Sequence, residues 1–534
     1  MGLQIHNSLT RRFEPFRPLK GRTVRLYTCG PTVYDFAHVG NLRTYVFEDI
    51  LKRVLKLNGY RIRHVMNITD VGHLTDDADQ GEDKLERAAA TQQKSARQLA
   101  AFYTRTFLKD IKRLNILKPD EMPRATQYIR EQIALVRRLE RLGYTYTIND
   151  GVYFDTSKFA AYGQAFAKDF SSPYGEGEKP VLRSFSEGGE GVDQRIFSPA
   201  HREGELEGVG VSAHSRIAVN PEKRSPHDFA LWKLTPPGVK RQMEWNSPWG
   251  VGFPGWHLEC SVMARTLLGQ PFDIHCGGID HIPIHHTNEI AQSEAAYGKP
   301  LAHFWLHGAF LTVEGKRMGK SEGNFITIDE LVRRGFDPLA YRYLVLGAHY
   351  RSPVNFTWDA LAGAQTALEH LREYCRTLPK ECRGGIYSLP LAGVRFTPAE
   401  ASEPAPTWSE GERAVIERLQ AAFNDDLDTP KALATLWDAV RSAANGQSKR
   451  GITSMEASAI IAYADQVLGL ELARFLGKPI RIPKKVQALA AAREEARRQK
   501  DWAHADLLRA QISALGFCVE DTKDGPAIRS ASRT

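Results

Sequence analysis

Cysteine is scarce in this sequence, which contains six in 534 residues. No two of them form a C-x-x-C motif, and so few in so long a chain exclude a disulfide framework. The scarcity therefore predicts a reducing compartment. The six are Cys29, Cys260, Cys276, Cys375, Cys382 and Cys518.

Long apolar runs are also missing. Residues 1–16, MGLQIHNSLTRRFEPF, lack the apolar core of a secretory signal peptide. No segment approaches the roughly 20 consecutive apolar residues that a membrane-spanning helix needs. Together with the few cysteines, these absences lead us to expect a cytoplasmic protein.

The composition is that of an ordinary globular protein, with 42% hydrophobic and 25% charged residues. The length exceeds what one hydrophobic core usually serves and predicts about two to four domains. The formal net charge of +8 suits a polyanionic partner, although many basic proteins bind no nucleic acid. The chain has no internal repeats.

The first clear supersecondary unit lies near the N-terminus. Residues 23–30, TVRLYTCG, predict a strand, and residues 41–60 predict a helix that ends at Asn58 and Gly59. Residues 61–71 predict a second strand, parallel to the first. The segment GPTVYDFAHVGN, residues 30–41, then lies at the carboxyl end of the first strand, where open parallel sheets bind ligands and helix N-termini favour phosphate.

The rest of the chain is mostly helical by pattern. Helical periodicity dominates residues 85–145 and again residues 358–470. Between them, residues 171–211 are rich in Gly, Ser, Glu and Pro and predict a mobile insertion.

The last segment predicts two helices, residues 486–499 and 502–515, the second capped by Asp501 and Gly516. Basic side chains of this segment predict contacts with nucleic-acid phosphates, although a solvated helix face is the alternative for each. They are Arg493, Arg497, Arg498, Lys500 and Arg509.

The tetrapeptide His38-Val39-Gly40-Asn41 begins the predicted N-terminal helix. An imidazole and an amide beside a glycine can approach phosphate closely and donate to its oxygens. The alternative is a capped helix start with an incidental histidine.

A second basic feature is EGKRMGKSEGN, residues 314–324, which carries Lys316, Arg317, Lys320 and Ser321 between glycines. Such a loop can close over a triphosphate and neutralise the leaving pyrophosphate. The spacing is not that of a Walker loop, and a solvated surface turn is the alternative.

The third feature is a scattered set of metal-ligand residue types. GWHLECS contains Cys260, and HIPIHHTNE contains His285, His286 and Glu289. His285 and Glu289 are four residues apart, so they share a face if the predicted helix at 288–297 extends to them. With Cys29 they complete a Cys-Cys-His-Glu set of the residue types that bind Zn²⁺. Their separations in the sequence match no compact zinc finger. For each residue, the alternative is an ordinary buried or surface residue that binds no metal.

Taken in order, these motifs resemble the cysteinyl-tRNA synthetases, which are class I aminoacyl-tRNA synthetases. HVGN at 38–41 is similar to the HIGH signature, and RMGKS at 317–321 is similar to the KMSKS loop, with Arg317 and Gly319 in place of lysine and serine. TCGPTVYDFAHVGN, DFALWK, PGWHLECS and FNDDLDTPKALATLWDAV resemble further family segments. The resemblance covers nearly the whole chain outside 171–211.

The resemblance implies ATP-dependent activation of L-cysteine and its transfer to tRNA(Cys), with Mg²⁺ accompanying ATP. It implies one Zn²⁺ that binds the substrate thiolate and is held by Cys29, Cys260, His285 and Glu289. ATP would be bound by His38, Gly40, Asn41, Lys320 and Ser321, among which His38, Asn41 and Lys320 would be catalytic. Amino-acid contacts would come from Gly30, Thr69, Trp256 and Asp280.

The implied fold is α/β. A Rossmann-type catalytic domain with a parallel sheet would occupy residues 1–350, with a connective insertion at about 85–240. A helical tRNA-binding domain would follow at 351–475 and a C-terminal anticodon-recognition segment at 476–534. We expect a monomer.

Two alternatives remain at this point. A cysteine ligase acting on an amino-sugar would keep both signatures and the zinc set but lack the tRNA-binding C-terminal half. A non-catalytic RNA-binding paralogue would have lost signature or zinc residues.

Overall fold

The computed structural model describes residues 2–72, 84–164, 166, 220–316, 318–319, 323–380, 408–445, 452–478, 482–522 and 525–530. The insertion expected to be mobile, residues 171–211, lies outside these residues, as do Arg317, Lys320 and Ser321 of the basic loop.

A parallel sheet with strand order β11-β10-β3-β4 forms the centre of the N-terminal part. Its strands are β3 (Thr23–Thr28), β4 (Arg61–Met66), β10 (Phe272–Gly278) and β11 (Ala302–Gly308). Helix α1 (Val39–Leu57) connects β3 to β4, and Asn58 caps its C-terminus before Gly59 with φ +75°. The predicted strand-helix-strand unit is therefore confirmed.

Strand β4 is shorter than predicted and ends at Met66 instead of residue 71. Its neighbour β3 ends at Thr28, so the pairing stops there. Beyond Met66 the backbone donates elsewhere, from Ile68 N to the Pro123 carbonyl and from Thr69 N to the Pro31 carbonyl. Residues 67–72 therefore leave the strand pairing and form part of the edge of the sheet at which ligands are expected to bind.

The two faces of the sheet belong to different cores. Val24 and Leu26 of β3 pack with the apolar side chains of α1. Tyr27 and Cys29, which alternate with them, pack in a second core with residues of α6 (Trp256–Leu268) and α7 (Thr287–Tyr297). Strand alternation thus places Cys29 on the α6 face.

Between β4 and α6 the chain forms helices and an antiparallel sheet. The helices are α2 (Lys84–Thr91), α3 (Ala96–Arg113) and α4 (Ile129–Arg141), as the helical pattern of 85–145 predicted. The sheet was not predicted and has the order β5-β6-β7-β9-β8. Its strands are β5 (Thr145–Ile148), β6 (Gly151–Phe154), β7 (Phe229–Leu234), β8 (Trp245–Ser247) and β9 (Gly250–Pro254).

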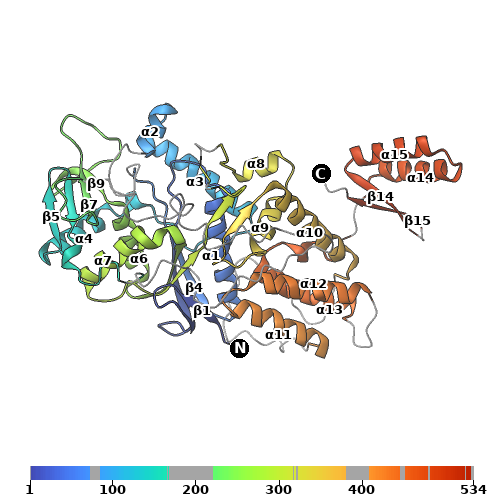
Figure 1. Ribbon diagram of the computed structural model, residues 1–534, viewed down its shortest axis with the longest axis horizontal. Coiled ribbons are helices and arrows are strands. Elements are labelled where there is room, and N and C mark those ends of the chain that lie inside the picture. Colours follow the sequence, from blue (N-terminus) through green and yellow to red (C-terminus); the bar gives the residue numbers. More distant parts are fainter. Residues whose placement is uncertain are drawn as a thin grey trace, which may run out of the picture.

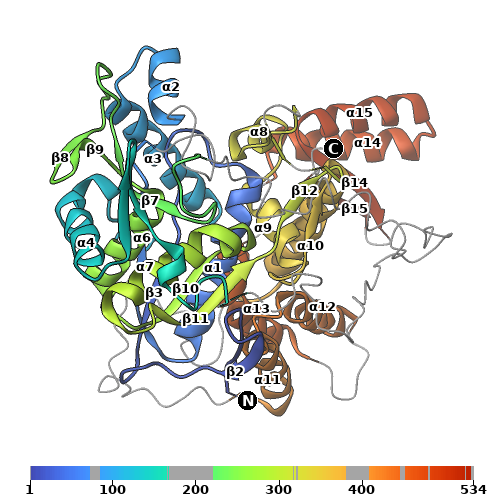
Figure 2. The same ribbon diagram turned by 60° about the vertical axis from the view of Figure 1, so that its left-hand side comes forward.

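Helices dominate the part after β11, as predicted. They are α8 (Ile328–Arg333), α9 (Pro338–Leu346), α10 (Trp358–Thr377), α11 (Glu410–Asn424), α12 (Thr429–Asn445) and α13 (Ser454–Leu468). In the same part, β12 (Leu311–Val313) pairs with β13 (Val354–Phe356). Figure 1 shows α11, α12 and α13 grouped on the side of α1 away from the antiparallel sheet. At the N-terminus, β1 (Gln4–Asn7) pairs with β2 (Arg12–Pro15), which lies beside α11 (Figure 2).

The C-terminal unit projects from the rest of the chain (Figure 1). It contains α14 (Lys484–Arg498), α15 (Trp502–Ala514) and an antiparallel hairpin of β14 (Phe517–Thr522) and β15 (Gly525–Ser530), which was not predicted. The predicted caps are confirmed, since Asp501 accepts from His504 N at 3.1 Å and Gly516 has φ +81°. A small core of Val486, Ala490, Ile512 and Val519 holds the unit together.

The basic side chains of this unit differ in role. Arg493 is 3% exposed and pairs with Asp521 of the hairpin at 2.8 Å, so it stabilises the unit instead of facing a phosphate. Arg497 pairs with the same carboxylate at 3.0 Å. Lys500 and Arg509 are exposed. The predicted phosphate contact is therefore wrong for Arg493.

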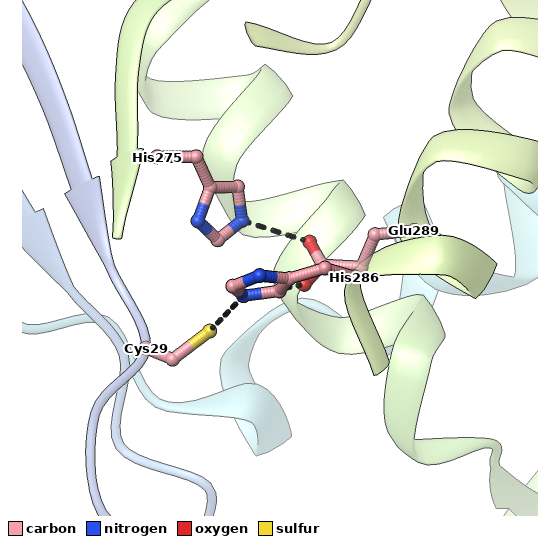
Figure 3. Close-up of side chains that lie close together, drawn as sticks. All are labelled: Cys29, His275, His286 and Glu289. Atoms are coloured by element: carbon pink, nitrogen blue, oxygen red, sulfur yellow. Dashed lines mark hydrogen bonds and ion pairs between the residues drawn. The ribbon is translucent and has the colours of Figure 1, made fainter. Parts of the chain in front are cut away.

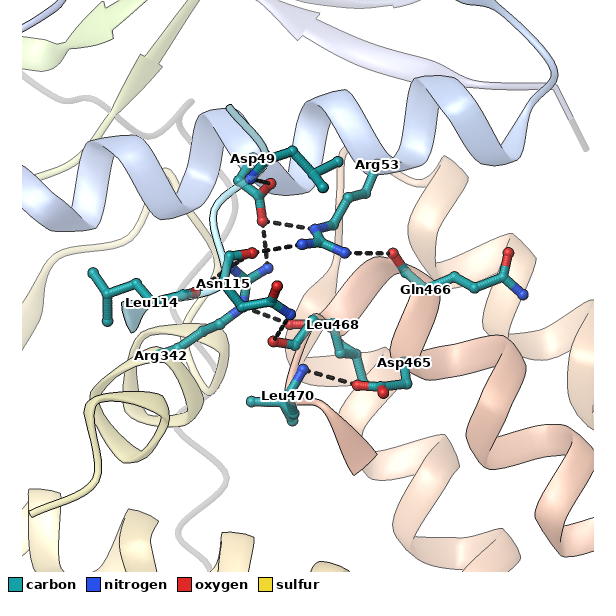
Figure 4. A network of polar contacts seen from close by, with 11 residues as sticks. Asp49, Arg53, Leu114, Asn115, Arg342, Asp465, Gln466, Leu468 and Leu470 are labelled. Atoms are coloured by element: carbon teal, nitrogen blue, oxygen red, sulfur yellow. Dashed lines mark hydrogen bonds and ion pairs between the residues drawn. The ribbon is translucent and has the colours of Figure 1, made fainter. Parts of the chain in front are cut away.

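A buried polar network joins α1 to the helical part (Figure 4). Asp49 of α1 accepts from Arg53 Nε at 2.7 Å and from Arg342 Nη2 of α9 at 2.6 Å. Burial would raise the pKa of Asp49, but the two guanidinium groups outweigh it and lower that pKa. Arg342 Nε also donates to the Leu468 carbonyl at 2.6 Å, and Arg53 Nη1 donates to the Gln466 carbonyl at 3.0 Å. The network therefore fixes α13 against α1, the helix capped by His38.

We expect Arg342→Met to lower the free energy of unfolding by about 3–5 kcal/mol, because it removes one partner from a fully buried charged network. The measurement is denaturant unfolding of the first cooperative transition. The matched control is Arg441→Met, whose guanidinium pairs with Asp438 at a side-chain exposure of 56% and should cost at most about 1 kcal/mol. Equal costs for the two variants would contradict the role assigned to the network.

None of the helices in the described ranges combines the length and apolar character needed to cross a membrane.

Candidate active site and metal centre

A pocket of about 360 Å³ opens at the carboxyl ends of β3, β4 and β10. Its walls come from the turn after β3, the start of α1, the segment after β4 and the start of α6. It brings together most of the site residues expected from the sequence: Cys29, Gly30, His38, Asn41, Thr69, Trp256, Cys260, Asp280 and His285. Gly40 lies against the His38 ring, and Glu289 is fully buried close to three of these residues. The predicted ligand edge of the sheet is thus where the pocket lies.

His38 and Asn41 hold each other at the start of α1. Asn41 N donates to His38 Nδ1 at 3.2 Å, and His38 N donates to Asn41 Oδ1 at 3.3 Å, which makes a reciprocal capping box. Because Nδ1 accepts, the neutral ring carries its proton on Nε2. Burial lowers the pKa of His38, which favours that neutral form. His38 therefore does cap the helix, and its Nε2–H remains available to donate to a ligand.

Two glycines allow the backbone to pass close to neighbouring atoms. A Cβ on Gly30 would lie 1.7 Å from the Asn67 carbonyl oxygen, and a Cβ on Gly40 would lie 2.9 Å from His38 Cε1. Gly30 N donates to Asn67 Oδ1 at 2.8 Å, and Asn67 Nδ2 donates to Thr69 Oγ1 at 2.9 Å. Side chains at either position would displace the pocket wall or the His38 ring.

The four expected metal ligands converge from four elements. Cys29 follows β3, Cys260 lies in α6, His285 lies in a π-helical turn (Ile282–His286) and Glu289 lies in α7. Their donor atoms lie within 4.8 Å of one another, and all four residues are buried. Donors of a tetrahedral Zn²⁺ site lie about 3.3–3.8 Å apart, given metal–ligand bonds of about 2.0–2.3 Å. The donor types and the spacing therefore fit a small ion after slight contraction.

His285 is oriented by a neighbouring histidine. Its Nδ1 lies 3.0 Å from His257 Nδ1, and its Nε2 lies 3.0 Å from Glu289 Oε1. Metal-binding histidines commonly use the second ring nitrogen in this way, which fixes the ring and its tautomer. The helix predicted at 288–297 is confirmed as α7, and the π-helical turn before it was not predicted.

A second set of ligand atoms overlaps the first (Figure 3). Cys29 and Glu289 belong to both sets, while His275 and His286 replace Cys260 and His285. His286 Nε2 lies 3.4 Å from Cys29 Sγ, and His275 Nε2 lies 3.2 Å from Glu289 Oε2. Neither His275 nor His286 lines the pocket, whereas Cys29, Cys260 and His285 do. Only the first set presents most of its ligands to a bound molecule.

The protonation pattern of the first set suits a cation. The contact with Cys29 and that with His285 outweigh burial and lower the pKa of Cys260 to about 7. Burial opposes the charged form of Glu289, but His275 and His285 lower its pKa to about 2. Burial likewise opposes charged His285, but Glu289 and Cys260 raise its pKa to about 10. A bound divalent cation would take the place of that proton beside the two anions.

Several pocket or near-pocket residues were missed by sequence reasoning. Asn67 holds Gly30, and Lys233 of β7 lines the pocket. His286 Nδ1 lies 2.7 Å from His307 Nε2, whose Nδ1 lies 2.8 Å from Ser8 Oγ. The density of histidine between residues 275 and 307 was the available signal, but it does not distinguish ligands from supporting residues.

The remaining expected amino-acid contacts occupy different parts of the wall. Trp256 begins α6, and its ring centroid lies 4.3 Å from that of His285. Thr69 is buried beside Asn67, and Asp280 is exposed just after β10. An indole, a hydroxyl and a carboxylate therefore line the same pocket as the candidate metal centre.

Comparisons with known proteins match the chain to two family descriptions. Residues 15–178 and 198–366 match a family described as tRNA synthetases class I (C) catalytic domain. Residues 481–529 match one described as Cysteinyl-tRNA ligase anticodon binding domain.

Curated relatives align along nearly the whole chain. Cysteine–tRNA ligase 1 of Burkholderia lata is 44% identical over 98% of this chain and 96% of its own length. The cysteine–tRNA ligases of Treponema denticola and Chlamydia pneumoniae are 36% and 39% identical, each over at least 98% of both chains.

Solved structures share the fold at low identity. A Mycobacterium tuberculosis methionyl-tRNA synthetase in complex with methionyl-adenylate aligns with a TM-score of 0.50 at 15% identity, over 85% of this chain and 90% of that one. The LeuRS of Agrobacterium radiobacter K84, in a ternary complex with tRNA and LeuAMS, aligns with a TM-score of 0.51 at 13% identity, over 87% of each chain. These matches bear on the fold alone.

Proposed function

The chain belongs to the cysteinyl-tRNA synthetases and is a class I cysteine–tRNA ligase, and from this premise we propose that one Zn²⁺, held by Cys29, Cys260, His285 and Glu289, selects its amino acid. The observation that carries the proposal is the convergence of these four buried donors within 4.8 Å, three of them lining the pocket that also contains His38 and Asn41.

Zinc supplies one function here when it is bound: it deprotonates a coordinated thiol, whereas the hydroxyl of serine is a much poorer ligand. An apolar pocket separates near-isosteric substrates poorly. Cys29, Cys260, His285 and Glu289 would hold the ion, and Trp256 covers the His285 ring. Cysteine is thus selected without an editing step.

The chemical step is an in-line displacement. A carboxylate oxygen of cysteine attacks the α-phosphorus of Mg-ATP, the bond to the bridging oxygen breaks, and pyrophosphate leaves with its electron pair. The terminal ribose hydroxyl of tRNA(Cys) then attacks the cysteinyl carbonyl and AMP leaves. Positioning and charge stabilisation account for most of such catalysis.

His38 and Asn41 bind the phosphates in this proposal. The capping box leaves the His38 Nε2 proton available to a phosphate oxygen, and the N-terminus of α1 favours negative charge at the same place. Gly30 offers bare backbone to the amino acid, while Thr69, Trp256 and Asp280 contact it. The roles of Lys320 and Ser321 at the leaving pyrophosphate rest on the sequence alone.

We place the catalytic domain at residues 1–350, the helical tRNA-binding domain at 351–475 and the anticodon-recognition segment at 476–534. The match of 481–529 to an anticodon-binding domain supports the last boundary. It also argues against an amino-sugar ligase, which would lack this half, and the intact Cys29, Cys260, His285 and Glu289 argue against an inactive paralogue. A monomer in the cytoplasm stays a prediction.

A chain ending at Lys478 is expected to retain cysteine-dependent ATP–pyrophosphate exchange, because the pocket and all four zinc ligands precede that residue. Charging of tRNA(Cys) should be slower. The KM for tRNA should rise at least about tenfold, because the phosphate contacts made by the removed unit are lost. Steady-state aminoacylation measures this. In the full chain, Lys500→Glu with Arg509→Glu should raise the same KM without changing exchange.

Equal charging by the truncated and full chains would show that the C-terminal unit does not recognise tRNA. A truncated chain that is folded by circular dichroism but inactive in exchange would instead contradict the assignment of activation to the N-terminal part.

A further inference from the structure

Tyr27 is a fully buried tyrosine of β3 that the mechanism above does not use. Its hydroxyl has no hydrogen-bond partner among the described residues. A buried hydroxyl without a partner costs about 1–3 kcal/mol. A phenylalanine would fill the same space without that cost, so the hydroxyl needs a functional reason.

The surroundings of Tyr27 are those of the metal centre. Tyr27 and Cys29 are two residues apart in an extended segment and therefore share a face of the sheet. Both belong to the apolar cluster that contains Cys260 of α6. On the neighbouring strand, His275 is the direct partner of Tyr27 in the register, with ring centroids 5.1 Å apart in an edge-to-face arrangement. Tyr27 thus packs in the core that contains Cys29 and Cys260, beside the histidine that holds Glu289.

The charges nearest the Tyr27 hydroxyl are those of the ligands themselves. The charged groups that interact with Tyr27 are Cys260, Cys29 and Glu289. A phenol keeps its proton at neutral pH, so the hydroxyl acts as a donor. The acceptors within its surroundings are two sulfur atoms and one carboxylate.

We propose that Tyr27 is a positioning residue of the zinc centre, whose O–H donates a hydrogen bond to the thiolate sulfur of Cys260 when the metal is bound. A neutral thiol is a weak acceptor, and metal coordination removes its proton and makes the sulfur a strong one. The hydrogen bond withdraws charge from the sulfur. With less charge donated by Cys260, a bound Zn²⁺ would attract the substrate thiolate more strongly.

This inference rests on the proposed zinc ligands. It adds Tyr27 as a residue that adjusts how much charge Cys260 donates to the metal. The test is Tyr27→Phe in the full-length protein, which removes only the hydroxyl. The control is Tyr350→Phe: Tyr350 is also buried, but its hydroxyl donates to Asp426 at 2.8 Å and its ring stacks on Phe47. Tyr350 does not line the pocket that contains the candidate metal ligands.

Two measurements address the metal centre directly. In protein loaded with Co²⁺ in place of Zn²⁺, the sulfur-to-cobalt charge-transfer band of Tyr27→Phe should move to longer wavelength, because a thiolate without its hydrogen bond is a better electron donor. In competition with a chromophoric chelator, its Zn²⁺ dissociation constant should rise about tenfold, at the lower end of the range for supporting residues, because the hydroxyl no longer stabilises the deprotonated Cys260 sulfur or holds it in place. The KM for cysteine should rise together with this dissociation constant. Tyr350→Phe should leave the charge-transfer band and the Zn²⁺ affinity unchanged.

The outcomes separate the two claims. An unchanged band and unchanged affinity in Tyr27→Phe would show that Tyr27 only fills the core, and the inference would be wrong while the zinc set stands. Absence of any sulfur-to-cobalt band in the unaltered protein would refute the zinc set itself. The metal-free Tyr27→Phe protein is expected to unfold at the same temperature as the unaltered one or higher, since the lost hydroxyl had no partner.

Discussion

Replacing Cys260 by alanine is expected to abolish stoichiometric zinc and, with it, cysteine activation. Cys260 is fully buried, supplies one of four converging donors and faces the pocket. Removing a thiolate from a tetrahedral set leaves three donors, with Glu289 and Cys29 still buried. We expect less than about 0.1 zinc per chain after dialysis, and pyrophosphate exchange reduced by at least about a thousandfold, because selection and positioning of the amino acid fail together.

The overlapping set in Figure 3 makes this prediction decisive. If His275 and His286 were the ligands with Cys29 and Glu289, Cys260→Ala would keep its zinc and His286→Asn would lose it. We expect the reverse, with zinc retained in His286→Asn. Cys375→Ser is the matched control, since Cys375 is a buried free thiol outside both sets. Metal analysis of the three purified variants is the measurement, and full zinc in Cys260→Ala would refute the assignment.

The second large effect is expected at His38. His38→Ala should lower the rate constant of adenylate formation about 100- to 1000-fold, the typical loss for one transition-state donor. The loss should appear mainly in kcat, because the charge on the phosphates grows as pyrophosphate departs. Pyrophosphate exchange at saturating cysteine and ATP measures it.

The capping role of His38 calls for a variant that separates structure from chemistry. His38→Ser supplies a good N-cap oxygen for Asn41 N but has no Nε2 proton. His38→Ala should cost about 1 kcal/mol of stability, and His38→Ser should recover it. If His38→Ser also recovered exchange, His38 would be a helix cap and nothing more. We expect it to be as slow as His38→Ala.

The strand-helix-strand unit was predicted correctly because its strands and its helix are determined mainly by residues close to one another in the sequence. Strand alternation in residues 23–28, helical spacing in α1 and the Asn58-Gly59 stop are decided by neighbouring residues. The caps of α15 were predictable for the same reason. The antiparallel sheet and the C-terminal hairpin were missed, because short apolar strands such as TYTI and GVYF are stabilised by partners distant in the chain.

The sequence by itself therefore determined the class of fold, the family and the residue types available to the site. The tertiary structure decided which of them meet. Cys29 and Cys260 are 231 positions apart in numbering, and their approach depends on strand alternation in β3 and on the packing of α6 against that face. The same packing encloses Tyr27 with the ligands and separates His286 from the pocket. Such choices follow from burial and close packing between distant segments, which no local pattern encodes.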